Sequence, residues 1–318
     1  MTRRYVSPLR YPGGKATLAA RLQPLVDATD AEVWMEPYAG GLGAGLALLD
    51  DDAVGEVWFS ERDPGLAGFW QYLLTDPQDL AERVAATVPT VELFDASRAV
   101  LTDTTASVHE LGYATFVVNR CSRSGIIHPR SGVIGGREQA GKYRVGDRFP
   151  AQALAERITY LAQYRHRLRF LGYDGVQAIR DLTGSGIEDE VFVFADPPYI
   201  HAGPDLYRPD ARTPGRDMHQ DLAYALGACP SPWALTYDQH PRVPQLYAGA
   251  RIQEFALRYS AARVREAGEY LVTPVWLPAA PLDPPATPPS SSTPDTQHPA
   301  EPEAVDGQLP GQQLLPGL

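Results

Sequence analysis

Short apolar runs alternate with amphipathic, helix-like segments along most of this 318-residue chain, and this alternation constrains the fold more than any other feature. Apolar runs bounded by polar or glycine-containing stretches are typical of buried strands. Alternating strands and helices indicate an α/β fold with a mainly parallel, doubly wound sheet, whose ligands lie at the carboxyl ends of the strands. We expect strands at Val33–Glu36, Glu56–Phe59, Leu168–Gly172, Val191–Ala195, Trp233–Tyr237 and Arg251–Tyr259.

One long segment interrupts the alternation. Residues 76–119 carry consecutive helical patterns with no strand between them, and residues 121–146 are rich in glycine, serine and arginine, as in a long loop or hairpin. We therefore expect a helical and basic-loop insertion over residues 76–168. The main α/β domain would then comprise residues 1–75 and 169–277.

The end of the chain differs in composition from the rest. From Pro278 to Leu318 it holds 11 of the 30 prolines and five acidic residues, but no lysine or arginine. Such a segment cannot bury enough apolar surface to offset the entropy of ordering. We expect residues 278–318 to form a disordered, acidic tail.

Charge is distributed unevenly. The chain carries 28 basic and 39 acidic residues, a net charge of −11, which on average argues against a polyanionic partner. Between Asn119 and Arg169, however, eleven basic residues accompany three acidic ones, so this segment carries +8 and the remainder −19. A local nucleic-acid footprint and a basic surface that only promotes solubility both fit this pattern.

Composition also bounds the cellular setting. No apolar stretch approaches the ~18 residues of a membrane span, and the residues after Met1 lack the apolar run of a secretory signal. We expect a cytoplasmic protein without a membrane partner. The two cysteines, Cys121 and Cys229, show no metal-ligand spacing, so we expect neither a metal site nor thiol chemistry.

The most informative motif is Asp196-Pro-Pro-Tyr199, directly after the apolar run Val191–Ala195. An exocyclic amine conjugated with a purine is a poor nucleophile, because its lone pair is delocalised into the ring. Two acceptors aimed at its hydrogens, the Asp196 carboxylate and the Pro197 carbonyl, would free that lone pair, and the prolines would hold both acceptors rigidly. Stacking on Tyr199 would contribute ~1–3 kcal/mol, comparable with the cost of removing a base from a duplex. The alternative is a turn that ends a strand, with aspartate as a cap.

A glycine-rich turn follows the first expected strand. The segment from Glu36 to Gly43 leads into a helical pattern, and its glycines would let the backbone approach a nucleoside closely. Glu61, after the next strand, is placed to accept hydrogen bonds from ribose hydroxyls. Two alternatives fit the same residues. A site for a nicotinamide dinucleotide would use a similar glycine turn and acidic residue, and a tight turn packed against the sheet would bind no ligand.

A third motif, Arg10-Tyr-Pro-Gly-Gly-Lys15, precedes every expected strand. Lysine occurs only at Lys15 and Lys142 among the 28 basic residues, which hints that a compact point charge is needed at Lys15. The alternative is a solvated lysine at the start of a helix.

These motifs, in this order, resemble the DNA adenine methylase family, the D12 class that includes bacterial Dam and phage-borne methylases. The resemblance covers roughly residues 5–276 and extends to Asn119-Arg120, Lys142-Tyr-Arg, His219, Tyr237-Asp238 and Glu269-Tyr-Leu-Val. It implies a Rossmann-like fold that uses S-adenosylmethionine, with the insertion as the target-recognition part. The implied reaction is direct transfer of the methyl group to the 6-amino group of a flipped adenine in double-stranded DNA, without a metal or a covalent enzyme intermediate.

The resemblance also implies roles for individual residues. Those for the target adenine are Asp196, Pro197 and Tyr199. Those for the cofactor are Tyr11, Lys15, Glu36, Tyr38, Gly40, Gly43, Glu61, Asp174 and Asp196. Those for DNA are Asn119, Arg120, Arg123, Arg130, Arg137 and Lys142.

The chain departs from Dam in the recognition part. Residues 131–141 do not match the Dam hairpin and are closer to phage-type members, so we do not infer recognition of GATC. Glu61 stands where the family usually has aspartate, which changes reach but not charge. A cognate restriction endonuclease is a further expected partner if the chain serves a restriction-modification system.

Other interpretations change the substrate. RNA and protein-glutamine methyltransferases use a similar acidic or amide residue before Pro-Pro-Tyr, and a non-catalytic DNA-binding relic would keep the fold. The basic insertion and the segment that ends at Lys15 favour DNA, and the intact Asp196-Pro-Pro-Tyr199 argues against a relic. A nicotinamide oxidoreductase leaves that motif unexplained.

Overall fold

A computed structural model describes most of the chain before the expected tail. The chain divides into a compact unit, residues 1–285, and a second unit, residues 286–318. Tyr11 and residues 283–318, which include the whole second unit, lie outside the described residues. The described ranges are 7–10, 14–123, 125–128, 130–200, 217–259 and 265–282.

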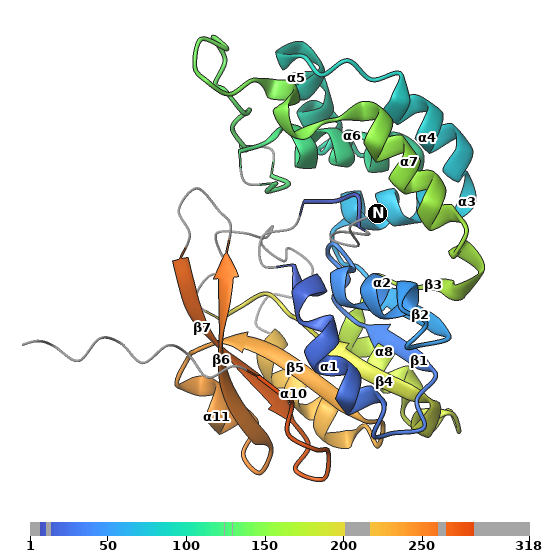
Figure 1. The fold of residues 1–318 in the computed structure, drawn as a ribbon, viewed down its shortest axis with the longest axis vertical. Helices are drawn as coiled ribbons and strands as arrows, with labels where there is room; N and C mark the ends of the chain where they lie inside the picture. Colours follow the sequence, from blue (N-terminus) through green and yellow to red (C-terminus); the bar gives the residue numbers. More distant parts are fainter. Residues whose placement is uncertain are drawn as a thin grey trace, which may run out of the picture. The chain divides into compact units, whose positions relative to one another are not determined.

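A seven-stranded sheet organises the compact unit (Figure 1). Its strand order is β3-β2-β1-β4-β5-β7-β6, with β1 to β5 parallel and β7 antiparallel to both β5 and β6. The expected α/β fold with a mainly parallel, doubly wound sheet is therefore confirmed. The strands are β1 (Val33–Glu36), β2 (Glu56–Ser60), β3 (Leu168–Gly172), β4 (Val191–Ala195), β5 (Trp233–Asp238), β6 (Arg251–Tyr259) and β7 (Arg265–Thr273).

Strand β7 is the element that the apolar pattern does not predict. Its first half, Arg265-Glu-Ala-Gly-Glu269, is polar and contains glycine, so it lacks the signature of a buried strand. It is a strand because its backbone pairs with β6, from Arg251 opposite Thr273 to Tyr259 opposite Arg265.

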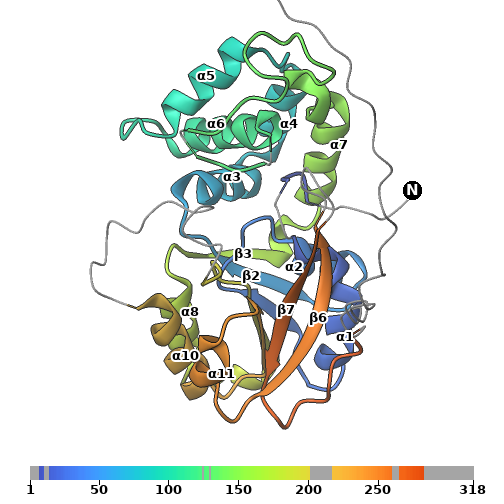
Figure 2. The ribbon, with the colours of Figure 1, turned by 90° about the vertical axis from the view of Figure 1, so that its left-hand side faces the viewer.

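Helices cover both faces of the sheet (Figure 2). Along β1, Trp34 packs into the core on one face, whereas Val33 and Met35 pack into the core on the other. Burial on both faces explains why β4 is apolar throughout, as parallel sheets require. The Trp34 face is covered by α1 (Ala19–Val26) and α2 (Gly43–Asp50), and the other face by α8 (Gly175–Leu182), α10 (Met218–Ala228) and α11 (Arg242–Leu246).

A group of helices lies between β2 and β3 in the chain. Its first helix, α3, begins at Asp63, whose carboxylate accepts hydrogen bonds from the backbone of Gly65 and Leu66. Helices α3 and α6 cross at Gly68 and Gly112, where a Cβ on Gly112 would lie 2.5 Å from the Gly68 carbonyl oxygen, so only glycine allows this approach. The helices are α3 (Pro64–Thr75), α4 (Pro77–Ala85), α5 (Val91–Val100), α6 (Val108–Cys121) and α7 (Ala151–Ala162).

The expected tail begins while the chain is still packed on the sheet. Ala280 exchanges two hydrogen bonds with the side chain of Gln253 in β6, and both Leu277 and Ala280 are buried. Separately, no helix of the described residues is long and apolar enough to cross a membrane.

The strand order also fixes where a ligand can bind. β1 and β4 are neighbours in the sheet, but the chain leaves β1 toward β2 and leaves β4 toward β5, on the opposite side. Open α/β sheets bind ligands at such a switch point, beyond the carboxyl ends of the strands. Glu36 ends β1 and Asp196 follows β4, so both acidic residues lie at this edge.

Candidate functional site

Two side chains hold the Asp196 carboxylate. Thr236 Oγ1 in β5 donates a hydrogen bond to Oδ1 at 2.6 Å, and the Lys15 ammonium lies 3.0 Å from Oδ2. Lys15 belongs to a short 3-10 helix, η1 (Lys15–Thr17), so three distant parts of the sequence meet here. The Lys15 side chain is 5% exposed and that of Asp196 22%, so Asp196 keeps an edge open to a partner.

Lys15 is surrounded by more than one acid. Glu269 Oε2 in β7 lies 3.8 Å from Nζ. The pKa of Glu36 is raised to about 8. Burial is the main cause, the Asp196 charge contributes in the same direction, and Lys15 acts in the opposite direction. Burial also raises the pKa of Glu269 to about 7, against the effect of Lys15. Three carboxyl groups around one ammonium leave excess negative charge when ionised, which suits a cationic ligand.

Glu36 organises the backbone after β1. Its Oε1 accepts hydrogen bonds from Trp34 Nε1 at 2.9 Å and from the Gly45 backbone at 2.6 Å. A Cβ on Gly45 would lie 2.9 Å from that oxygen, so glycine is needed for the contact. Glu36 thereby anchors the start of α2 beside the Lys15–Asp196 pair.

Glu61 holds the other side of the glycine turn. Its carboxylate accepts hydrogen bonds from the backbone of Gly40 and Asp63, each at 2.8 Å, and burial raises its pKa to about 7. Gly40 has a φ of +47°, a left-handed conformation that favours glycine. A carboxylate has about four lone-pair positions, so Glu61 can still accept hydrogen bonds from a ligand.

Gly43 makes a close contact with the segment that carries Lys15, and its role toward the cofactor stays a prediction. A Cβ there would lie 3.1 Å from the backbone nitrogen of Ala16 and 3.5 Å from that of Lys15. The close approach is therefore to the η1 backbone. Gly43 lets α2 pack against the segment that carries Lys15.

The rest of the Asp196-Pro-Pro-Tyr199 motif is anchored on β5. Pro197 is buried, and the Tyr199 hydroxyl is buried while the residue as a whole keeps exposed surface. The Lys15 ammonium lies 5.2 Å from the centre of the Tyr199 ring. The backbone nitrogen of Ile200 donates to Asp238 Oδ1 at 3.1 Å, which ties the end of the motif to the neighbouring strand.

Tyr237, next to Asp238 in β5, contacts both α10 and the Asp196-Pro-Pro-Tyr199 motif. Its hydroxyl lies 2.7 Å from His219 Nδ1 in α10, and its ring centre lies 6.2 Å from that of Tyr199. Tyr237 has no exposed surface. It packs behind Tyr199 and is not available to a ligand.

Asp174 and Tyr38 lie at the same edge of the sheet. Asp174 is exposed and caps α8 by accepting a hydrogen bond from the Gln177 backbone at 3.0 Å. The pKa of Tyr38 is raised by burial and by the Asp174 charge. A Cβ on Gly175 would lie 2.1 Å from the Pro37 carbonyl oxygen, so α8 begins directly against the turn after β1.

The sequence did not predict that Thr236 and Glu269 lie at this site, although the segment from Glu269 is part of the family resemblance. Thr236 is the polar residue inside the apolar run Trp233–Tyr237. This run follows the strand that precedes Asp196, so a polar residue within it was a signal of a contact with the site. Glu269 lies on β7, the strand that the pattern did not reveal.

Two residues expected at DNA are buried inside the helical part. Asn119 has no exposed surface; its side chain accepts a hydrogen bond from the Arg10 backbone and donates to the carbonyls of Arg10 and Gly125. Arg120 is 9% exposed and donates to the Pro8 carbonyl, with burial lowering its pKa to about 9. We reassign both residues to holding the segment around Arg10, because neither offers a free surface to DNA.

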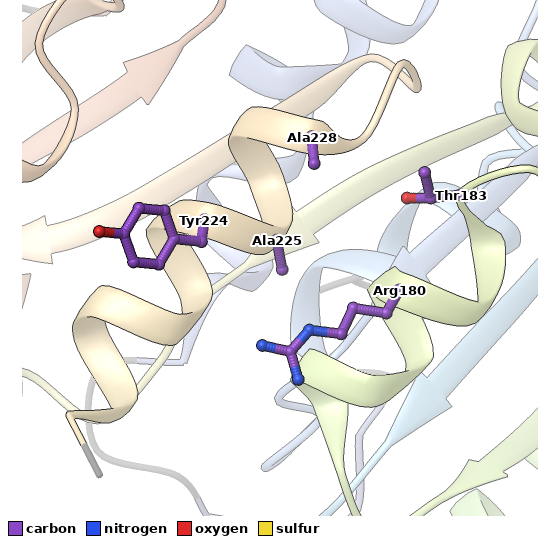
Figure 3. A pocket seen from close by; sticks show the side chains of 5 residues that line it. All are labelled: Arg180, Thr183, Tyr224, Ala225 and Ala228. Atoms are coloured by element: carbon purple, nitrogen blue, oxygen red, sulfur yellow. The ribbon is translucent and has the colours of Figure 1, made fainter.

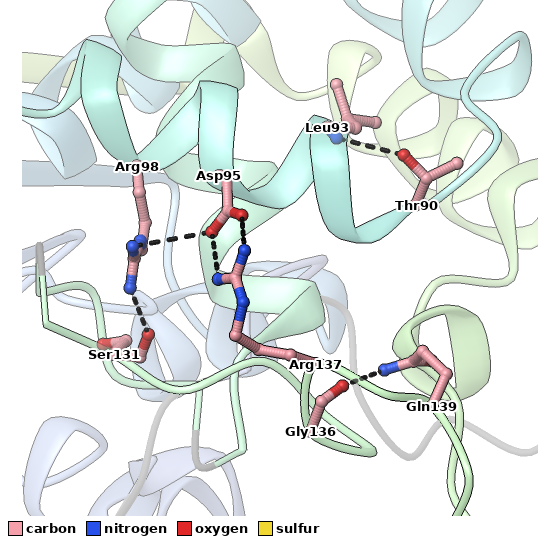
Figure 4. Close-up of polar contacts among 8 residues, drawn as sticks. All are labelled: Thr90, Leu93, Asp95, Arg98, Ser131, Gly136, Arg137 and Gln139. Carbon is pink, nitrogen blue, oxygen red and sulfur yellow. Dashed lines mark hydrogen bonds and ion pairs between the residues drawn. The ribbon is translucent and has the colours of Figure 1, made fainter.

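The loop after α6 is exposed and fastened to α5. Arg137 makes two hydrogen bonds to Asp95, and Arg98 donates to the Ser131 carbonyl (Figure 4). A bridge between Ser122 and Val133 gives the loop a hairpin base. Arg123, Arg130 and Lys142 are exposed, whereas Arg137 is exposed but paired.

A surface pocket between α8 and α10 contains none of the expected residues (Figure 3). It is lined by Arg180, Thr183, Tyr224, Ala225 and Ala228. Its side chains come from helices of one outer layer, so it is separate from the Asp196 site.

Comparison with known proteins identifies a family. Residues 11–208 match the family described as D12 class N6 adenine-specific DNA methyltransferase. No curated protein matches the chain. Among solved structures, the chain is similar to the rRNA methyltransferase aviRa from Streptomyces viridochromogenes, at 19% identity over 83% of this chain and 86% of that chain, with a TM-score of 0.38. That likeness is too distant to bear on the substrate.

Proposed function

The chain belongs to the D12 class of N6 adenine-specific DNA methyltransferases, and on that premise we propose that it methylates an adenine flipped out of double-stranded DNA, with S-adenosylmethionine as donor. The observation that carries the proposal is the Asp196 carboxylate, held by Lys15 and Thr236 at the switch point of the sheet. A rigid acceptor at this place, directly before two prolines and an aromatic ring, fits the activation of an exocyclic amine.

The donor set of the site fits the cofactor. S-adenosylmethionine carries a sulfonium and an ammonium, and supplies an electrophilic methyl group when bound. The excess of carboxyl groups around Lys15 suits these positive charges, and the Lys15 ammonium suits the cofactor's single carboxylate. The turn from Glu36 to Gly43 and the remaining lone pairs of Glu61 would hold the methionine and ribose parts. Asp174 and Tyr38, at the same edge of the sheet, would hold the adenine.

Asp196 and Pro197 would act on the target base. The Asp196 carboxylate and the Pro197 carbonyl would each accept a hydrogen bond from one of the two N–H groups of the amine, so that the nitrogen lone pair turns toward the methyl group. As the N–C bond formed, the bond between the methyl carbon and the sulfonium sulfur would break and leave a neutral thioether. Positive charge would develop on the nitrogen, and the fixed Asp196 charge would stabilise it. One N–H bond then breaks, and the proton leaves toward Asp196. Tyr199 stacks on the base.

DNA would contact the exposed part of the recognition loop. Arg123, Arg130 and Lys142 offer cations to phosphates or base edges, and Arg137 joins them once it leaves Asp95. A cognate restriction endonuclease stays a prediction from the resemblance.

Sequencing of the product tests the function. The purified protein is incubated with S-adenosylmethionine and unmethylated genomic DNA, and modified adenines are mapped by single-molecule sequencing. We expect N6-methyladenine in one short motif, and none when the cofactor is omitted. Unmodified DNA, with methyl transfer found on RNA or protein in parallel reactions, would overturn the substrate assignment.

A further inference from the structure

Glu269 is a buried acid that the proposed chemistry does not use. It lies in β7, is 1% exposed, and among the described residues its carboxylate has no close hydrogen bond, only a weak one from the Tyr199 side chain. Its opposite neighbour in the sheet is Asp238, another acid. A buried carboxylate with so little hydrogen bonding lowers stability, so its position needs an explanation other than packing.

Glu269 forms an ion pair with Lys15. The Lys15 Nζ atom lies 3.8 Å from Glu269 Oε2 and 3.0 Å from Asp196 Oδ2, so one ammonium is shared between two carboxylates. Tyr199 adjoins both acids, because their charges raise the pKa of its hydroxyl after the larger effect of burial. The groups that face Glu269 are Lys15, Asp196, Tyr199 and Asp238.

We propose that Glu269 is a positioning residue of the methyl-transfer site, which holds the Lys15 ammonium between itself and Asp196. This proposal rests on the proposed function. Without Glu269, Lys15 would pair more strongly with Asp196 and withdraw charge from the carboxylate that must accept hydrogen bonds from the amine. With Glu269 present, Lys15 orients Asp196 and leaves it more negative charge for the substrate.

Lysine labelling tests the contact without measuring activity. The chain has only two lysines, Lys15 and Lys142, so protein labelled with carbon-13 at the lysine Cε gives two side-chain NMR signals, which Lys142→Arg assigns. In Glu269→Gln the Lys15 signal should shift and titrate at lower pH, because an opposite charge is lost. The Lys142 signal should not change. The matched control is Glu254→Gln on β6, an exposed acid on the neighbouring strand, which should leave both signals unchanged.

Kinetics distinguish positioning from a structural role. Glu269→Gln should lower kcat by about 10-fold and leave KM for DNA and cofactor within about twofold. Because burial raises the pKa of Glu269 to about 7, kcat of the wild type should rise between about pH 6 and 8, and that rise should be absent in Glu269→Gln. The melting temperature should change little, since Lys15 keeps its ion pair with Asp196 when the Glu269 charge is removed. Glu254→Gln should match the wild type in every measurement.

A second variant covers a folding failure. Glu269→Asp keeps the charge but withdraws it by one methylene, and should give an intermediate kcat with the pH-dependent rise retained. Wild-type kcat and an unshifted Lys15 signal in Glu269→Gln would overturn the proposal. A wild-type protein that does not methylate DNA would refute the proposed function instead, while the lysine signals would still report whether Glu269 and Lys15 interact.

Discussion

The Lys15 ammonium lies 3.0 Å from Asp196 Oδ2, although 181 residues separate the two in the chain. One residue precedes the sheet and the other follows its central strand β4, so the contact exists only when the whole α/β unit is folded. The same ammonium lies 3.8 Å from Glu269 in the last strand. The first and last elements of the compact unit therefore converge on the carboxylate proposed to activate the amine.

Thr236→Val should lower activity without unfolding the protein. The change preserves shape but removes the 2.6 Å hydrogen bond to Asp196 Oδ1. Hydrogen bonds to charged groups contribute ~1.5–3 kcal/mol, so we expect kcat to fall by roughly 10- to 100-fold. Steady-state methylation of DNA measures this change.

The matched control is Thr273→Val in β7. Thr273 is equally buried, but its hydroxyl has no hydrogen-bond partner among the described residues. This variant should keep wild-type kcat. Equal losses in both variants would mean that any threonine-to-valine change in this sheet disturbs the site, and would contradict the specific role of Thr236.

The unliganded protein should lose stability as pH rises from about 5 to 8. The pKa values of Glu36, Glu61 and Glu269 are raised by burial to about 8, 7 and 7, so the folded state binds more protons than the unfolded state in this range. Burial lowers the pKa of His219, so below about pH 6.5 this residue binds its proton more readily in the unfolded state. Its contribution to stability therefore changes with pH in the opposite direction. We expect the free energy of unfolding to fall by on the order of a few kcal/mol.

Denaturant unfolding at a series of pH values measures this dependence. Glu36→Gln, which removes the group with the largest of the three shifts, should flatten the decline. A free energy of unfolding that stays constant or rises from pH 5 to 8 would show that burial does not raise the pKa values of these glutamates.

The apolar pattern was sufficient to predict the parallel part of the fold. Strands such as β4 are buried on both faces, so their sequences are continuously apolar and their ends are sharp. Because ligands bind beyond such ends, the placement of Asp196 and Glu36 at one edge also followed from the sequence. The contact of Asp196 with Thr236 did not, since it depends on which strand becomes the neighbour of β4.

Two other features depended on tertiary packing that no local pattern carries. β7 is a strand through its pairing with β5 and β6, and its polar first half gave no sign that Glu269 lies in the sheet. Asn119 and Arg120 look like a basic surface in the sequence, but helix α6 turns them inward toward Pro8 and Arg10. A charge count cannot tell whether an arginine meets DNA or a backbone carbonyl.

Gly45→Ala should weaken both the fold and cofactor binding. Its Cβ would lie 2.9 Å from Glu36 Oε1, Trp34 Cδ1 and Val57 Cγ1, so the Glu36 carboxylate must move. We expect a loss of about 1–3 kcal/mol in the free energy of unfolding and roughly 10-fold weaker binding of S-adenosylmethionine. Gly227→Ala in α10 has no atom within 4 Å of the new Cβ; it should be neutral or stabilise by about 0.5–1 kcal/mol. Calorimetry compares the two, and unchanged cofactor affinity in Gly45→Ala would contradict the role of the turn.

Arg130→Ala and Asn119→Ala should have opposite signatures. Arg130 is exposed, so its loss should weaken DNA binding and reduce the salt dependence of the affinity by about one counterion, with an unchanged melting temperature. Asn119 is buried and makes three hydrogen bonds, so its loss should cost about 1–3 kcal/mol of stability. Thermal melts and DNA titrations at several salt concentrations separate these effects. An Asn119→Ala protein that melts normally but binds DNA poorly would return Asn119 to the DNA interface.

The central claim is that Asp196 activates the 6-amino group of adenine in DNA, and mass spectrometry of nucleosides tests it most directly. Wild type, Asp196→Ala and the control Asp189→Asn, an exposed acid at the other end of β4, are incubated with S-adenosylmethionine and unmethylated DNA, and the digested DNA is assayed for N6-methyladenine. We predict N6-methyladenine with the wild type and Asp189→Asn, and at least about 100-fold less with Asp196→Ala, although that variant binds the cofactor with nearly wild-type affinity. Equal N6-methyladenine with Asp196→Ala, or a methyl group on another atom or another polymer, would contradict the account.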